Sequence, residues 1–197
     1  MIIGILDYKN CSILPIYYSI KSHNVKVKII EKPNELKDVD KLVFPGVGAT
    51  NQIMSYLVQN NFIDEIKNFA NLQKKILGIC AGMQILGTKL NENNNHYGLD
   101  FFESEVLPID KNIYLKSTNI GWINVKTKKD NQSYYFCHSF YMKFYDEKDE
   151  SIIGHIDLIK KIPAIIKRGN IIGVQFHPEK SQSNGRSLIA DFLYDKI

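Results

Sequence analysis

The chain has 197 residues, and its 25 lysines and arginines against 21 aspartates and glutamates give a formal net charge of +4. This length suits one domain over residues 1–197, which buries a full core without disulfides or a structural metal. Hydrophobic residues make up 44% and charged residues 23%, which excludes wholesale disorder. No apolar run approaches the roughly 18 residues of a membrane span, and Met1–Leu6 is too short for a signal peptide. We therefore expect a cytoplasmic protein with no membrane partner.

Cysteine and histidine spacing gives no sign of a metal site. The three cysteines, Cys11, Cys80 and Cys137, are odd in number and contain no C-x-x-C pair, which argues against a disulfide framework or a zinc ribbon. The five histidines lack ligand spacing such as H-x-x-x-H. The basic residues form only short, scattered clusters, which are typical of solvated surfaces. We expect no metal, no cofactor and no nucleic-acid partner.

The first half of the chain alternates predicted strands and helices. The apolar run Ile2–Leu6 is typical of a strand buried on both faces of a parallel sheet. Ser12 is placed to cap a helix whose apolar residues recur from Ile13 to Ile20. The next predicted elements are an edge strand over Val25–Ile30, a strand over Lys41–Phe44, helices over Gln52–Val58 and Phe62–Leu72, a strand over Ile76–Ile79 and a helix over Met83–Leu90. This order predicts an α/β fold with a doubly wound, mostly parallel sheet and helices on both faces.

The second half changes to short strands after an asparagine-rich turn at Asn91–His96. The predicted strands are Glu103–Leu107, Trp122–Lys126, Tyr134–Cys137, Ile152–His155, Ala164–Lys167 and Ile171–Phe176. A helix over Asn184–Tyr194 follows them. We expect this half to add a smaller mixed or antiparallel strand region to the sheet.

Cys80 lies between two glycines where a buried strand gives way to a helix, in the run Gly78-Ile79-Cys80-Ala81-Gly82. This pattern matches the strained strand-to-helix turn of G-x-S-x-G hydrolases, with cysteine in place of serine. The helix N-terminus favours the thiolate, and the Ala81 amide points to where an oxyanion would form. The alternative is a buried structural cysteine, the commonest fate of a lone thiol.

His177-Pro178-Glu179 follows an apolar, strand-like segment, so the histidine emerges where open α/β sheets build their sites. In an extended segment, residues two apart point the same way, and Glu179 can then accept a hydrogen bond from the His177 ring. Pro178 would keep a helix from starting there. That bond would leave the other ring nitrogen for the Cys80 sulfur. The alternative is a histidine that caps the sheet beside an exposed glutamate.

Two other segments compete for a role in the site. Cys137 and His138 are adjacent in a predicted strand and point to opposite faces, so they cannot form a nucleophile–base pair, and Cys137 is expected in the core. Pro45-Gly46-Val47-Gly48 has no lysine and is not a phosphate-binding loop. It does place backbone amides at the end of a strand, where they suit a second oxyanion donor.

Several motifs, in order along nearly the whole chain, resemble those of the class I glutamine amidotransferases. They are Pro45-Gly46-Val47-Gly48, Gly78-Ile79-Cys80-Ala81-Gly82-Met83-Gln84, Ile120-Gly121-Trp122, Cys137-His138-Ser139-Phe140-Tyr141 and Gly173-Val174-Gln175-Phe176-His177-Pro178-Glu179-Lys180-Ser181. The form P-G-V-G resembles most the glutaminase subunit of imidazole glycerol phosphate synthase.

The resemblance implies hydrolysis of L-glutamine by a Cys80–His177–Glu179 triad, without a cofactor. It implies an oxyanion and substrate pocket lined by Gly46, Val47, Gly48, Ala81, Gln84, His138, Ser139 and Phe140. It also implies a heterodimer in which the ammonia passes to a (β/α)8-barrel cyclase of histidine biosynthesis. Trp122 and Lys180 would lie at that interface, although Trp122 is equally expected in the core.

The chain departs from the family pattern where the family contacts its partner. The usual D-Y-G-x-G-N becomes Asp7-Tyr8-Lys9-Asn10-Cys11-Ser12, and P-H-x-G-W-N becomes Ser117-Thr118-Asn119-Ile120-Gly121-Trp122-Ile123. The alternative acceptor is a surface-glycan sugar, in which an acetamido group becomes acetamidino. A catalytically silent binding subunit and a papain-like thiol hydrolase are the remaining alternatives. The intact triad argues against the first and the early strand–helix alternation against the second.

Overall fold

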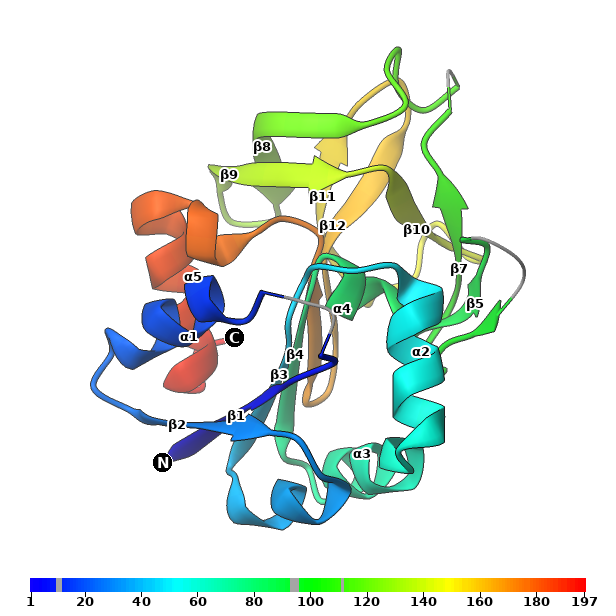
Figure 1. The fold of residues 1–197 in the computed structure, drawn as a ribbon. Coiled ribbons are helices and arrows are strands. Elements are labelled where there is room, and N and C mark those ends of the chain that lie inside the picture. The colour runs from blue at the N-terminus through cyan, green and yellow to red at the C-terminus, as the bar shows by residue number, and fades with distance from the viewer. Residues whose placement is uncertain (10–11, 93–95, 111) are drawn as a thin grey trace.

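The computed structural model describes residues 1–9, 12–92, 96–110 and 112–197 (Figure 1). Its principal sheet is built from β1 (Ile2–Leu6), β2 (Lys26–Ile30), β3 (Lys41–Phe44), β4 (Lys75–Ile79), β8 (Asn119–Thr127), β9 (Asn131–His138), β11 (Ile152–Asp157), β12 (Lys161–Arg168) and β13 (Ile171–Val174). Within the described residues the order is β2-β1-β3-β4-β13-β12-β11-β8-β9. The strands from β2 to β13 pair in parallel, and those from β13 to β9 pair antiparallel.

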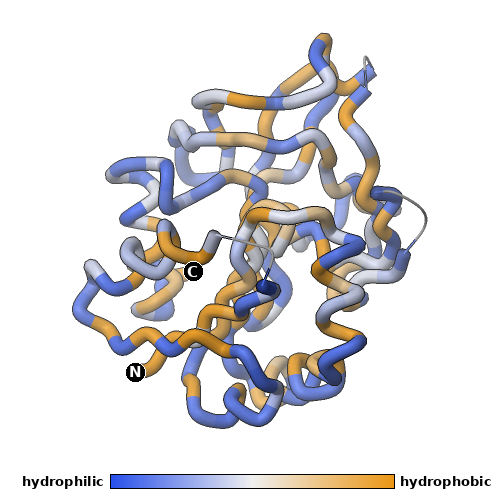
Figure 2. The backbone as a smooth tube through the Cα atoms, in the orientation of Figure 1, coloured by the Kyte–Doolittle hydropathy of each residue, from blue (hydrophilic) through white to orange (hydrophobic). Residues whose placement is uncertain are grey.

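Helices cover both faces of the parallel strands. They are α1 (Leu14–Lys21), α2 (Thr50–Gln59), α3 (Phe62–Asn71), α4 (Ala81–Gln84) and α5 (Gln182–Leu193), with 3₁₀ turns η1 (Pro33–Asp38) and η2 (Pro178–Lys180). Successive side chains of β3 point to opposite faces of the sheet, and each face has its own hydrophobic core. Leu42 and Phe44 pack with α2 and α3, while Val43 packs with α1 and α5. Figure 2 shows apolar residues along the central strands.

A smaller sheet consists of β5 (Gly87–Leu90), β6 (His96–Tyr97), β7 (Phe102–Pro108) and β10 (Phe140–Phe144), in the order β10-β7-β5-β6. Its β5–β7 pairing is parallel and its other pairings are antiparallel. The fold class expected from the sequence is confirmed: a doubly wound α/β sheet with helices on both faces and a smaller mixed strand region.

Two local predictions are wrong. The predicted helix over Met83–Leu90 ends after one turn, and Gly87–Leu90 is strand β5. A Cβ at Gly87 would lie 2.6 Å from the Ser104 hydroxyl, so β7 packs too closely there for a helical side chain. Ser12 does not cap α1, whose N-cap residue is Ile13 with no side-chain bond. Proline in the first turn starts this helix instead.

The described part of the chain contains no helix that is both long enough and apolar enough to cross a bilayer. Nor do its described histidine, cysteine and acidic side chains form any group of three that could hold a metal ion.

Candidate active site

Cys80 occupies a strained turn between β4 and α4. Its φ of 48° and ψ of −107° lie outside the regions that non-glycine residues favour. The Cys80 amide donates to the Val174 carbonyl at 2.7 Å, and the amides of Met83 and Gln84 donate to the Cys80 carbonyl at 3.0 Å. Hydrogen bonds from the amide and to the carbonyl of Cys80 therefore stabilise its strained backbone conformation.

The glycines around Cys80 are required by close backbone contacts. A Cβ at Gly78 would lie 2.4 Å from the Gly82 carbonyl oxygen, and one at Gly82 would lie 2.3 Å from the Phe44 carbonyl oxygen. A Cβ at Gly46 would lie 2.7 Å from the Ile79 carbonyl oxygen. No side chain fits at these positions, so β3, β4 and α4 meet backbone to backbone around the thiol.

His177 lies three residues beyond Val174, which pairs with Ile79 at the end of β4, and it lines the same pocket as Cys80. Its Nδ1 donates to Glu179 Oε1 at 2.8 Å, and the two side chains are only 3% and 8% exposed. The expected bond between them is therefore present. The expected effect of Pro178 is wrong, because η2 begins at Pro178, directly after the extended His177.

The surroundings of His177 favour its charged form. Burial opposes a charge on the ring, but interactions with the Cys80 sulfur and with Glu179 outweigh burial and raise the pKa of His177 to about 10. At neutral pH the ring is therefore an imidazolium between sulfur and carboxylate. Glu179 Oε2 is buried without a hydrogen-bond partner among the described residues.

The second histidine of the site is neutral. Burial lowers the pKa of His138 to about 4, with the nearby His177 also lowering it and the Phe140 carbonyl opposing the change. His138 Nδ1 donates to that carbonyl at 2.7 Å, and its Nε2 lies 2.9 Å from Asn119 Nδ2. This histidine acts as a fixed polar contact rather than as a base.

The two expected oxyanion donors do not converge in this structure. The Ala81 amide faces the Gly46 carbonyl oxygen at 3.5 Å, so a carbonyl lies where an oxyanion would need donors. The Gly46–Val47 peptide thus presents its oxygen to the strained turn at Cys80. Gly48 next to it has a φ of 119°, so the backbone of this loop is one that glycine permits.

A pocket of about 310 Å³ opens at Cys80 and His177. The predicted substrate residues all line it: Gly46, Val47, Gly48, Ala81, Gln84, His138, Ser139 and Phe140. Lys180, predicted at a partner interface, also lines it and is exposed. Nothing in these contacts assigns a role to each residue, but the structure brings them together at one end of the sheet.

Trp122 and Cys137 lie on an exposed face of the β8–β9 pair. Trp122 is 47% exposed, which excludes the core placement, and its ring packs edge-on against Tyr135. Cys137 is exposed, so its predicted core position is wrong. Phe136 and His138 point inward on β9, and alternation turns Cys137 outward. Cys11 lies outside the described residues.

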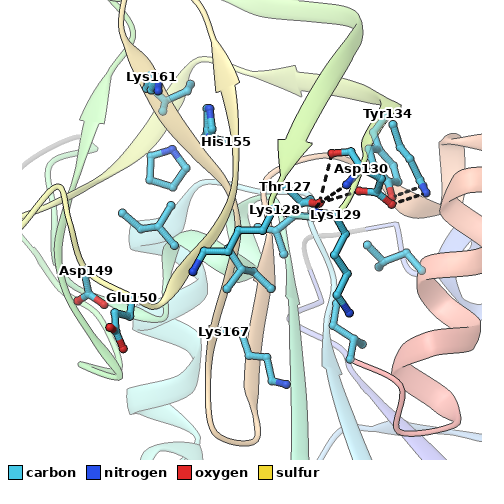
Figure 3. A pocket seen from close by; sticks show the side chains of 18 of the residues that line it. Thr127, Lys128, Lys129, Asp130, Tyr134, Asp149, Glu150, His155, Lys161 and Lys167 are labelled. Atoms are coloured by element: carbon cyan, nitrogen blue, oxygen red, sulfur yellow. Dashed lines mark hydrogen bonds between the residues drawn. The ribbon is translucent and has the colours of Figure 1, made fainter.

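A larger hollow of about 840 Å³ lies away from Cys80, among β8, β9, β11, β12 and α5. Figure 3 shows Lys128, Lys129, Lys161 and Lys167 around it. It shares no lining residue with the pocket at Cys80 and contains no cysteine. The nucleophile and its base therefore belong to the smaller pocket.

Sequence reasoning missed two residues of the site. Glu92 is the one carboxylate among the described residues that line the pocket, and its Oε2 accepts bonds from the Thr50 amide and hydroxyl, both at 2.7 Å. It falls in the asparagine-rich turn, where no pattern marks it. Gln175 is fully buried, and its Nε2 lies 3.6 Å from Cys80 Sγ. The Q-F-H-P-E run contained it, but strand alternation alone does not predict that contact.

Comparisons with known proteins identify the family of the chain. The family model Glutamine amidotransferase class-I matches residues 6–196. The chain is 34% identical to the imidazole glycerol phosphate synthase subunit HisH 1 of Campylobacter jejuni (strain RM1221), over 97% of this chain and 98% of that one. It is 32% identical to the HisH subunit of Leptospira interrogans, over 96% and 98%.

Solved structures show the same fold. A structure of PurLQS from Thermotoga maritima superposes with a TM-score of 0.79 at 14% identity, covering 100% of this chain and 99% of that one. A crystal structure of a glutamine amidotransferase gives 0.77 at 18% identity, covering 98% and 97%. With a family match over almost its whole length and relatives above 30% identity, the chain belongs to the class I glutamine amidotransferases.

Proposed function

We propose that this chain hydrolyses L-glutamine to glutamate and ammonia with a Cys80–His177–Glu179 triad. The observation that carries the proposal is the strained Cys80 beside a buried, charge-paired His177. The thiolate is the form in which cysteine attacks an amide most readily.

The geometry supports the following sequence of steps. Cys80 Sγ attacks the side-chain carbonyl carbon of glutamine, and His177 gives its proton to the departing ammonia. The resulting thioester is attacked by water, whose proton returns to His177, and glutamate leaves as the thiolate is restored. Glu179 keeps the His177 ring oriented and its charge stabilised through both steps.

Charge complementarity supports a site for the amino-acid end of glutamine. Glu92 lines the pocket and suits the α-ammonium group. Gln84 donates both amide hydrogens elsewhere, to the Phe140 carbonyl at 2.9 Å and to Gln175 Oε1 at 3.1 Å. Only its oxygen is left, so Gln84 would accept a hydrogen bond from the substrate. The backbone at His138 to Phe140 completes the walls.

The Gly46 carbonyl supports a resting state of low activity. Losing one oxyanion donor costs roughly 10²–10³ in rate, so a peptide that presents oxygen instead of an amide is a sufficient off-state. Free ammonia escapes into water, so a glutaminase that supplies an acceptor enzyme gains from being inactive alone. We infer that rotation of the Gly46–Val47 peptide, set by a docked partner, completes the oxyanion site.

A docking surface lies beside the pocket. Ile120 and Trp122 on β8 are 60% and 47% exposed, and Cys137 beside them on β9 is exposed. With Lys180 at the pocket rim, this face suits a partner that covers the active site. Because the relatives compared are named as subunits of imidazole glycerol phosphate synthase, the proposed partner is its (β/α)8-barrel cyclase subunit, in histidine biosynthesis. None of those names supports the sugar acceptor.

Substitution of the nucleophile tests the proposal. Cys80→Ala should abolish glutamine hydrolysis in the presence of partner, because without the nucleophile only residual binding effects remain. A glutamine-mimicking chloroketone should modify Cys80 ahead of the exposed Cys137, as peptide mass spectrometry would show. Near-normal turnover by Cys80→Ala, with an unchanged circular dichroism spectrum, would contradict the triad.

A further inference from the structure

We propose that Gln175 is a catalytic residue whose side-chain amide donates a hydrogen bond to the Cys80 sulfur and stabilises its negative charge. The inference rests on the proposed glutaminase function and adds a fourth side chain to that site. Gln175 directly follows β13 and is completely buried, and its Nε2 lies 3.6 Å from Cys80 Sγ. This distance suits a hydrogen bond to the larger sulfur atom.

The orientation of the Gln175 amide follows from a fixed acceptor. The Phe140 carbonyl can only accept, and β10 is the edge strand of its sheet, so this oxygen is free for side chains. Gln84 must therefore turn its NH₂ group toward Phe140, at 2.9 Å. The second hydrogen of that group points at Gln175, which must present its oxygen, at 3.1 Å. The Gln175 NH₂ group is then left to face the sulfur.

The same carbonyl also fixes the other side of the network. His138 Nδ1 donates to Phe140 at 2.7 Å, so its Nε2 has to accept a hydrogen bond. Asn119 Nδ2 lies 2.9 Å from that nitrogen and supplies it. Asn119 and His138 are both buried, at 0% and 5% exposure. Gln84 is thus a positioning residue for Gln175, and the Phe140 carbonyl orients the side chains of Gln84 and His138.

The sulfur needs this donor because its other neighbours leave the charge under-compensated. The Cys137 carbonyl oxygen, 3.8 Å from Sγ, can only accept and so favours the protonated thiol. Helix α4 has only four residues, so its dipole is much weaker than that of the longer helix expected from the sequence. His177 and Gln175 are the side chains that oppose the Cys137 carbonyl.

The bond acts on the first chemical step. A hydrogen bond to the thiolate raises the fraction of ionised sulfur at any pH below the midpoint of ionisation. It also lowers the intrinsic nucleophilicity of the thiolate, but by less, because the Brønsted slope is about 0.4–0.5. Once the thioester forms, the sulfur carries no full charge and the bond weakens. The bond strengthens again when water expels the sulfur from the thioester, so it also assists the second step.

Alkylation of Cys80 by iodoacetamide across pH measures the effect without glutamine turnover. The other titratable groups that line the pocket are His177, His138, Cys137, Glu92 and Lys180. In Gln175→Leu we expect the midpoint of the alkylation profile to rise by about one pH unit. Gln175→Glu keeps the shape but replaces the donor with an acidic group, and should raise the midpoint further.

Controls separate this effect from general damage. Cys137, followed in the same digest, should alkylate equally in all variants, and Gln59→Leu on the exposed end of α2 should leave the Cys80 profile unchanged. If either Gln175 variant fails to fold, the wild-type protein gives a second measurement: the NMR signals of the Gln175 side-chain NH₂ group are followed across pH. They should shift with pH at the alkylation midpoint of Cys80.

An unchanged midpoint in folded Gln175 variants would overturn the proposal, as would Gln175 NH₂ signals that do not respond to ionisation of Cys80. The proposed glutaminase function fails separately. If Cys80 alkylates as expected but the wild-type protein with its partner releases no ammonia from glutamine, that function falls while the role of Gln175 at the sulfur stands.

Discussion

Replacing Glu179 with glutamine tests how much the buried ion pair contributes. The substitution keeps the size of the side chain and an oxygen that can accept from His177 Nδ1, but it removes the charge. His177 and Glu179 are 3% and 8% exposed and 2.8 Å apart, so solvent screens the pair little. Loss of a hydrogen bond between charged groups costs about 1.5–3 kcal/mol, or about one to two pH units in the pKa of His177.

The pH dependence of stability follows from the raised pKa of His177. Because this pKa rises from 6.5 in the unfolded chain to about 10 in the folded one, its contribution to stability is full below pH 6.5. The contribution then falls as pH rises and is lost as pH passes through about 10. Glu179→Gln should therefore be destabilised by about 1.5–3 kcal/mol at pH 6, with a difference from wild type that shrinks toward pH 10.

Urea unfolding at pH 6, 7.5 and 9 measures this difference, and Glu103→Gln on β7 is the matched control because Glu103 is exposed. Turnover with partner should fall by roughly 10–10²-fold, less than in Cys80→Ala, because the nucleophile and its base remain. A stability difference independent of pH would refute the ion pair. Loss of turnover as deep as in Cys80→Ala, with the fold intact, would show that Glu179 does more than orient His177.

Three further substitutions address the turn at Cys80 and the partner. Gly82→Ala should lower the free energy of unfolding by about 1–3 kcal/mol, measured by urea unfolding, because its Cβ would lie 2.3 Å from the Phe44 carbonyl oxygen and must push β3 away. The isolated chain should hydrolyse glutamine slowly and be stimulated by the cyclase with its acceptor ligand bound. Trp122→Ala and Lys180→Ala should each reduce that stimulation in steady-state assays, and a fully active isolated chain would refute the switch.

Sequence periodicity predicted the parallel half of the fold well, for a physical reason. Buried parallel strands such as Ile2–Leu6 and Lys41–Phe44 are continuous apolar runs, and both occur where expected. Cys80 and His177 follow such strands, so the ends of β4 and β13 bring them to one edge. The strain at Cys80 was also predictable, since only a turn this tight requires glycines on both sides.

The remaining features depend on contacts between distant segments. Strand β10 carries no clear alternation and forms because β7 offers it a partner. The one-turn α4 gives way to β5 because β7 packs against Gly87. Glu92 and Gln175 reach the pocket through loop placement and amide orientation, which no periodic pattern encodes. Sequence therefore identified the residues of the proposed triad, while the groups around them needed the structure.

The catalytic base and the docking surface are parts of one hydrogen-bonded unit. Trp122 packs on Tyr135, and the Tyr135 carbonyl accepts from the His177 amide at 2.9 Å. The Tyr135 amide donates to Ser181 Oγ at 2.9 Å, and that hydroxyl donates to the His177 carbonyl at 2.6 Å. We therefore infer that the proposed partner, if it docks on the β8–β9 pair, would act on the turn that carries His177 and Glu179 without an intervening loop.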